Sequence, residues 1–131
     1  MMTTKEFFHN KINWKIYNRI LDICTELDDN SIDYNISVQV CQRTRKINDR
    51  LSDRRFHTIY QYDDYPVHDD YEAYAFEDYY KQMGLFYTIE FYETYDWHSI
   101  IDKISKSKDI ILIDDLWGDF RLFRYKEKKI K

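Results

Sequence analysis

The length, composition and charge of this chain limit what it can be. Its 131 residues suffice for one domain with a buried core, and a hydrophobic share of 44% with an aromatic share of 18% excludes a disordered chain. The formal net charge is −4. No apolar run approaches the roughly 20 residues of a membrane helix, and the start of the chain lacks the apolar core of a signal peptide. We therefore expect a cytoplasmic protein without membrane contact, folded as a single domain over residues 1–131, with 126–131 as a flexible basic tail.

The charges of the chain form blocks, which bear on its partners more than on its fold. Residues 1–55 carry 10 basic and 8 acidic side chains, and residues 103–131 carry 9 basic and 5 acidic ones. Between them, residues 56–102 carry 11 acidic side chains and one lysine. Within this block, Tyr60–Tyr80 holds seven acids and seven tyrosines but no lysine or arginine. Tyrosine combines a flat apolar ring with a polar tip, so such a segment is typical of a surface that contacts a partner.

The first element that the sequence predicts is a long helix from about Thr4 to Leu27. Thr3 and Glu6 match a capping box, in which each side chain satisfies a backbone N–H of the other residue. Apolar residues then recur at helical spacing around most of the girth, which is typical of a core helix covered on more than one side. The inward face consists of Phe8, Ile12, Ile16, Ile20, Ile23, Cys24 and Leu27.

A strand is predicted over Ser31–Cys41, because apolar and polar residues alternate strictly there. This alternation favours a sheet with one buried face and one wet or lightly covered face. The apolar side consists of Ile32, Tyr34, Ile36, Val38 and Val40.

The rest of the chain predicts four more strands and at least two more helices. Pro66 ends the second strand, and Gly84 suits the left-handed cap of a helix. The predicted elements are a strand over Phe56–Tyr62, a helix over Asp70–Met83, a strand over Leu85–Tyr95, a short helix after Asp96, and strands over Asp109–Asp114 and Phe120–Tyr125. In the second strand, the side chains expected to share one side are Phe56, Thr58, Tyr60 and Tyr62. The fold class is therefore α+β, with a mixed or mainly antiparallel sheet of about five strands and the N-terminal helix packed on one face.

Motifs of known enzymes are absent from the sequence. It contains no Gly-rich phosphate loop, no zinc-ligand spacing and no nucleophile elbow, and its four histidines are scattered. The acids around Pro66 lack the spacing and the glycine of an EF-hand calcium loop. We therefore expect no catalytic residues, no metal site and no cofactor.

A metal-dependent nuclease is one alternative. Such enzymes hold Mg²⁺ between two carboxylates and place a lysine near the attacking water. Acids on one C-terminal strand and a Glu-Lys-Lys run after the next strand are similar to that arrangement, although the run lies in a charged tail rather than on an apolar strand. The candidates are Asp114, Asp115, Glu127, Lys128 and Lys129.

A small nucleic-acid-binding regulator is the other alternative. Residues 42–55 are strongly basic, and their side chains could neutralise phosphates. The i, i+4 spacing of Ile47 and Leu51 fits a short helix there, and a long hairpin loop stays open as the other interpretation. The acidic block would repel a polyanion unless the two regions lie on opposite faces. The candidate contacts are Arg43, Arg45, Lys46, Arg50, Arg54 and Arg55.

The leading hypothesis is a non-enzymatic inhibitor or regulator that binds another protein. Its acidic, tyrosine-rich surface would occupy a basic site on a nucleic-acid-handling partner, with carboxylates in place of phosphates and tyrosines stacking where bases would. Residue preferences that follow A/T-rich codons favour a virus or mobile element as the source, and the tyrosine-rich strands leave a homodimer open. The residues expected to contact the partner are Asp63, Asp64, Asp69, Asp70, Tyr71, Tyr74, Glu77 and Asp78.

Overall fold

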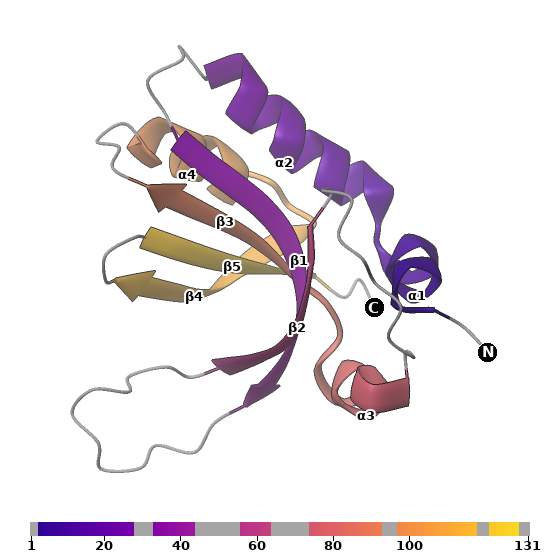
Figure 1. The fold of residues 1–131 in the computed structure, drawn as a ribbon. Coiled ribbons are helices and arrows are strands. Elements are labelled where there is room, and N and C mark those ends of the chain that lie inside the picture. Colours follow the sequence, from indigo (N-terminus) through magenta and orange to yellow (C-terminus); the bar gives the residue numbers. More distant parts are fainter. Residues whose placement is uncertain are drawn as a thin grey trace.

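A computed structural model of the chain contains four helices and five strands within the residues that it describes (Figure 1). The described residues are 3–27, 33–43, 56–63, 74–92, 97–117 and 121–128. The helices are α1 (Thr4–Lys11), α2 (Trp14–Leu27), α3 (Tyr74–Met83) and α4 (Trp97–Ser105). The strands are β1 (Asp33–Arg43), β2 (Phe56–Asp63), β3 (Phe86–Tyr92), β4 (Ile110–Trp117) and β5 (Arg121–Glu127).

The five strands form one antiparallel sheet in the order β2-β1-β3-β5-β4. In the middle of β1, Val38 pairs with Tyr62 of β2 on one side and with Tyr87 of β3 on the other. The helices α1, α2 and α4 share one apolar core with alternate residues of the strands, and α2 contacts α4 on this face (Figure 1). The α+β class and the N-terminal helical segment on one face of the sheet are therefore confirmed. No helix in the described part of the chain is long and apolar enough to cross a membrane.

The predicted single N-terminal helix is wrong, because the chain breaks between α1 and α2. Ile12 adopts an extended backbone (φ −63°, ψ 131°) while its side chain stays buried. Asn13 then caps α2: its Oδ1 accepts hydrogen bonds from the backbone N–H groups of Lys15 at 3.2 Å and Ile16 at 3.4 Å. Asparagine favours such a cap over a helix interior, so one polar residue divides the predicted helix into two.

Both faces of the sheet are buried in the middle of β1, so the face that was expected to be wet or lightly covered is fully covered there. Val38 and Val40 face the helices as expected. On the opposite side, however, Ser37 is 0% and Gln39 is 1% exposed. Their polar side chains are paired within the protein, as buried polar groups generally are. Alternating polarity in β1 therefore separates an apolar buried face from a polar buried face.

The prediction that Phe56, Thr58, Tyr60 and Tyr62 of β2 share one side of the sheet is also wrong. The register between β1 and β2 shifts between Val40 and Cys41. Tyr60 and Tyr62 accordingly pack with the helix-side core, whereas Phe56 packs with Cys41 in a separate cluster on the other face. A bulge of this kind changes which residues of a strand share a face, and the period-two pattern of the sequence does not reveal it.

The other predicted elements agree with the structure in type. The cap at Thr3 is confirmed, since its hydroxyl accepts from the N–H of Glu6 at 3.2 Å. The helix α3 ends at Met83 as predicted, and Gly84 follows with φ 74°. In β3 and α4, the residues that pack into the helix-side core are Tyr87, Ile89, Phe91, Ile100, Ile101 and Ile104.

The ends of several elements differ from the prediction. β4 extends to Trp117, and β5 includes Lys126 and Glu127 from the predicted basic tail. Lys128 continues the pairing, because its N–H donates to the carbonyl oxygen of Asp109 at 2.7 Å. The predicted beginning of α3 at residues 70–73 and the predicted end of β3 at residues 93–95 lie outside the described residues.

An ion pair joins α2 to the start of β4. Arg19 donates from Nη1 and Nη2 to the two carboxylate oxygens of Asp109, each at 2.5 Å. This bidentate hydrogen bonding holds the pKa of Asp109 below its ordinary value and raises that of Arg19. About a third of each side chain is exposed, so solvent screens the pair.

Replacing Gly84 should test the left-handed cap of α3. We expect Gly84→Ala to lower the free energy of unfolding by about 1 kcal/mol, because L-residues disfavour positive φ. Space is available, since the nearest atom to an added Cβ would be Cε of Lys126 at 3.9 Å. Gly84→Asn should be less destabilising, because asparagine tolerates this region. Urea unfolding of both variants measures the effect, and an alanine variant as stable as wild type would contradict it.

Removing the Asp109 carboxylate should change how stability depends on pH. The pKa of Asp109 is lowered in the fold, so its contribution is present above the ordinary value of about 4 and is lost as pH falls through the folded pKa. We expect Asp109→Asn to reduce stability by up to about 1 kcal/mol at neutral pH, and the difference to shrink below pH ~4. Urea unfolding across this pH range, with Arg19→Gln to complete a double-mutant cycle, checks the result. A difference that is constant with pH would show that the pair does not cause it.

Candidate functional site

The acidic residues expected to contact a partner fall partly within the described structure. Glu77 and Asp78 lie on α3, with half-buried and exposed side chains respectively. Asp63 ends β2 and Tyr74 begins α3, and only the backbone of these two is described. The residues of this set that lie outside the described part are Asp64, Asp69, Asp70 and Tyr71.

The helix α3 is anchored by tyrosines and carries acids toward solvent. Tyr79 and Tyr80 pack against the helix-side core, and the ring of Tyr80 meets that of Phe7 edge-on with centroids 5.0 Å apart. Glu77 forms an exposed pair with Lys81 one turn later, at 3.8 Å. Asp78 is exposed and forms no ion pair with any residue that the structure describes. The arrangement leaves carboxylates on the side of α3 that faces away from the core.

The residues of the two alternative sites are described less fully. Arg43 is the last residue of β1 and is exposed, and Lys128 follows β5 and is also exposed. Only the backbone of Asp114 is described. The candidates that lie outside the described part are Arg45, Lys46, Arg50, Arg54, Arg55 and Lys129, together with the helix or loop expected at 44–55.

The structure does not bring together the described carboxylates of the nuclease alternative. Asp115 accepts from Nη2 of Arg121 at 3.0 Å, and Glu127 accepts from Nδ2 of Asn13 at 2.8 Å. Asp115 pairs in the ladder with Phe123, four residues before Glu127, so the two acids belong to positions about 13 Å apart. Among the described residues, no group of three or more His, Cys, Asp or Glu could hold a metal ion.

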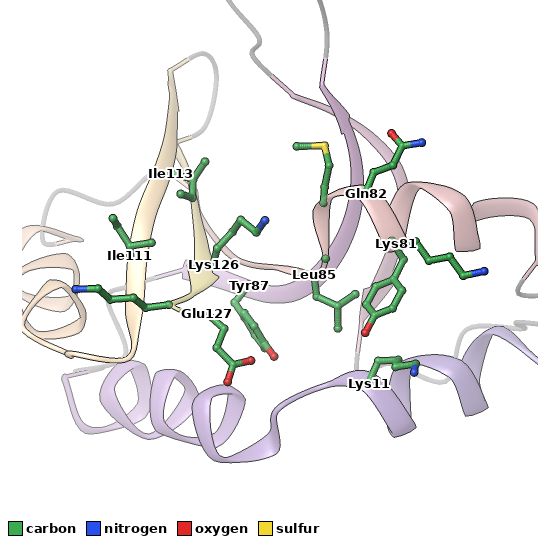
Figure 2. A pocket seen from close by; sticks show the side chains of 13 residues that line it. Lys11, Lys81, Gln82, Leu85, Tyr87, Ile111, Ile113, Lys126 and Glu127 are labelled. Atoms are coloured by element: carbon green, nitrogen blue, oxygen red, sulfur yellow. The ribbon is translucent and has the colours of Figure 1, made fainter. Parts of the chain in front are cut away.

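An open pocket of about 840 Å³ lies between α3, the end of α1 and the paired strands β4 and β5 (Figure 2). We call it the lysine pocket, because four lysines line it beside a single acid, Glu127. Figure 2 shows Lys126 projecting from β5 toward α3, with Lys11 and Lys81 on the opposite side. The lysines are Lys11, Lys81, Lys126 and Lys128. The aromatic and apolar lining consists of Tyr80, Tyr87, Met83, Leu85, Ile111 and Ile113.

Two of these lysines are held by aromatic rings. The Nζ of Lys126 lies 5.3 Å from the ring centroid of Phe86, and that of Lys11 lies 5.6 Å from the centroid of Tyr80. The stem of Lys126 also passes close to Gly84, where no side chain competes for the space. The ammonium groups are therefore positioned by packing rather than projecting freely into solvent.

Asn13 organises one end of the lysine pocket. Its backbone N–H donates to Oη of Tyr87, and its Nδ2 donates to Oε1 of Glu127, both at 2.8 Å. Burial raises the pKa of Tyr87 to about 12, so the phenol stays protonated at neutral pH and can donate a hydrogen bond. The residue that divides the two N-terminal helices thus also places a phenol and a carboxylate in the pocket wall.

A second polar cluster lies on the sheet face opposite the helices. Gln39 Oε1 accepts from Oγ1 of Thr58 at 3.1 Å and from Nε of Arg124 at 3.2 Å. Nη2 of Arg124 also contacts Oγ1 of Thr58 at 3.3 Å, and Nε2 of Gln39 donates to Oε1 of Gln61 at 2.9 Å. Arg124 is only 4% exposed. Because these groups satisfy one another away from solvent, we interpret the cluster as structural.

The sequence did not predict the lysine pocket. Its lysines come from positions 11, 81, 126 and 128, and only the folded sheet brings these segments together. The one signal in the sequence was the excess of basic residues in 103–131, of which 126–131 were expected to form a flexible tail. In the structure Lys126 belongs to β5, and Lys128 is paired by its backbone with Asp109.

Comparison with known proteins gives no relative. No family model matches the sequence, and neither a curated protein nor a solved structure is significantly similar to the chain.

The role of Asn13 can be tested by two substitutions. Asn13→Ala removes the cap of α2 and the bond to Glu127, so we expect the free energy of unfolding to fall by about 1 kcal/mol. Asn13→Ser keeps a capping oxygen but cannot reach Glu127 in the same way, and it should be less destabilising. Thermal and urea unfolding compare the two. Equal destabilisation by serine and alanine would contradict the capping role.

Proposed function

We propose that this protein is a non-enzymatic regulator that binds another protein through the acidic outer surface of α3 and the acidic segment before it. The supporting observation is the orientation of α3: Tyr79 and Tyr80 pack toward the core, while Glu77 and Asp78 are left toward solvent. The sequence immediately before this helix contains no lysine or arginine and adds further acids, namely Asp63, Asp64, Asp69, Asp70 and Glu72.

The chemistry of this surface favours a basic partner. Carboxylates attract a lysine- or arginine-rich site, and nucleic-acid-handling proteins carry such sites for phosphate. Charge density argues against an imitation of a whole duplex, which carries one charge per ~1.7 Å of axis. The ten residues of α3 span about 15 Å and hold two acids and one lysine. A local plug in a basic groove therefore fits better than a duplex mimic.

Neutralising the acids of this surface should weaken partner binding without unfolding the protein. We expect the triple variant Asp70→Asn, Glu77→Gln, Asp78→Asn to bind the partner at least about tenfold more weakly, because complementary charges at an interface are lost. The measurement is capture of the partner on immobilised protein at low and high salt, followed by titration of the purified partner. Nucleic acid should compete with the wild-type protein, since both would occupy the same basic site.

A matched control tests whether position matters rather than total charge. Asp22→Asn, Glu26→Gln, Asp102→Asn removes the same kinds of acid from exposed positions on α2 and α4. This variant should bind the partner as wild type does. Equal weakening by both triples, or unchanged binding by the α3 triple, would overturn the proposed surface.

A further inference from the structure

We propose that the lysine pocket binds nucleotide phosphates, either in a free nucleotide or in a short single-stranded nucleic acid. This site is separate from the acidic surface proposed to bind a protein. The first observation is that four lysines, from α1, α3 and the end of β5, line one pocket together with a single carboxylate. Like charges that share one pocket repel each other, so an anion bound among them is stabilised by all of them.

Three of the lysines are free of a strong ion pair with the described residues. Lys11 and Lys128 form no ion pair with any residue in the described part of the chain. Lys81 pairs with Glu77, but the pair is exposed and 3.8 Å long. Such surface pairs contribute at most about 1 kcal/mol, so a phosphate can replace the glutamate. A lysine ammonium binds phosphate oxygens as a compact point charge.

The pocket offers more than positive charge. Ile111 of β4 is 49% exposed and lines the pocket with Ile113, and Tyr80 lines it from α3, so both sides offer apolar surface against which a flat base can pack. The protonated hydroxyl of Tyr87 can donate to a phosphate oxygen. The carboxylate of Glu127, held by Asn13, can accept a hydrogen bond from a sugar hydroxyl. Inorganic phosphate would leave the apolar wall and the carboxylate unused, whereas a nucleotide uses both.

The size of the pocket and the charge of the chain limit the ligand further. About 840 Å³ lies within the range of roughly 300–1,000 Å³ that is typical of small-molecule sites. A long duplex would also meet carboxylates of α3 beside the pocket, since Glu77 lies 3.8 Å from Lys81, and these repel a polyanion. One or a few nucleotides therefore fit the site better than double-stranded nucleic acid.

Fluorescence anisotropy with two probes tests the site: a fluorescent adenosine triphosphate analogue and a short fluorescein-labelled single-stranded RNA. We expect Lys126→Gln, Lys128→Gln to weaken binding by about tenfold or more, since phosphate contacts dominate such affinity. For RNA, the slope of log affinity against log salt should also decrease by about 1.4, because each neutralised phosphate of a single strand contributes ~0.7. Binding of only the nucleotide, or only the RNA, supports the site and identifies its source of phosphate.

A matched variant and a second pair of lysines make the test specific. Lys103→Gln, Lys106→Gln removes the same charge from exposed positions at α4 and directly after it, and should change affinity by no more than about twofold because salt screens distant charges. The double variant Lys11→Gln, Lys81→Gln removes the two lysines that line the pocket from the helices. It should weaken binding as much as Lys126→Gln, Lys128→Gln does. Circular dichroism confirms that each variant is folded.

Three results would overturn the nucleotide site. The first is no binding of either probe at low salt, and the second is equal weakening by the α4 control. The third is tighter binding of a glutamate-rich peptide than of either probe, which would assign the pocket to an acidic protein segment. None of these results depends on the protein partner of α3, so failure of one proposal can be distinguished from failure of the other.

Discussion

The packing of α1, α2 and α4 on the apolar face of the sheet is the interaction on which the rest of the structure depends. Val38, Ile89 and Phe123, from the three central strands, are 0–2% exposed beneath these helices. Each fully buried side chain of this kind contributes about 1.5–3 kcal/mol. Because neighbouring residues of a strand point to opposite sides, this core also fixes which residues reach the other face. Burial of Tyr125 on the helix side, for example, places its neighbour Lys126 at the lysine pocket.

The sheet face opposite the helices is buried and polar, so its side chains must find hydrogen-bond partners within the protein. A buried polar group without a partner would cost about 1–3 kcal/mol, so each must meet its complement when the strands pair. Ser37 and Thr88 hydrogen-bond across β1 and β3 through their hydroxyls at 2.5 Å, and Gln39 and Thr58 join Arg124 across β1, β2 and β5. The observed strand order and register satisfy these groups together. This polar face therefore contributes to the uniqueness of the sheet as well as to its stability.

The sequence predicted the features that depend on local pattern. Alternation marked β1, and the glycine at position 84 marked the end of α3, because both signals reside in neighbouring residues. The break at Asn13 combines a local cap of α2 with hydrogen bonds to Tyr87 and Glu127, which lie far along the chain and have no local signature. The bulge after Val40 likewise arises from pairing with β2 and has no local signature.

Of the two candidate sites, one could be predicted from local sequence and the other could not. Glu77 and Asp78 could be placed on the outer side of a helix from the sequence alone, because the neighbouring tyrosines supply its inner face. The lysine pocket could not, because Lys11, Lys81 and Lys126 are separated by dozens of residues and meet only through the sheet. A basic residue in a terminal segment is typical of a solvated tail. Strand pairing of β5 with β3 and β4 gives the same residue a fixed position.

The two charged surfaces meet on α3, and their separation decides whether they can act together. Charges screened by salt interact little beyond the Debye length, which is about 8 Å under physiological conditions. Glu77, however, lies only 3.8 Å from Nζ of Lys81, which lines the pocket, so screening does not separate the two surfaces at this point. The exposed pair of Glu77 and Lys81 is the one described ion pair on α3. An anion that draws Lys81 into the pocket would leave Glu77 unpaired, which strengthens rather than weakens the attraction of the outer surface for a basic partner. An acidic surface and a basic pocket on one small domain are therefore physically compatible.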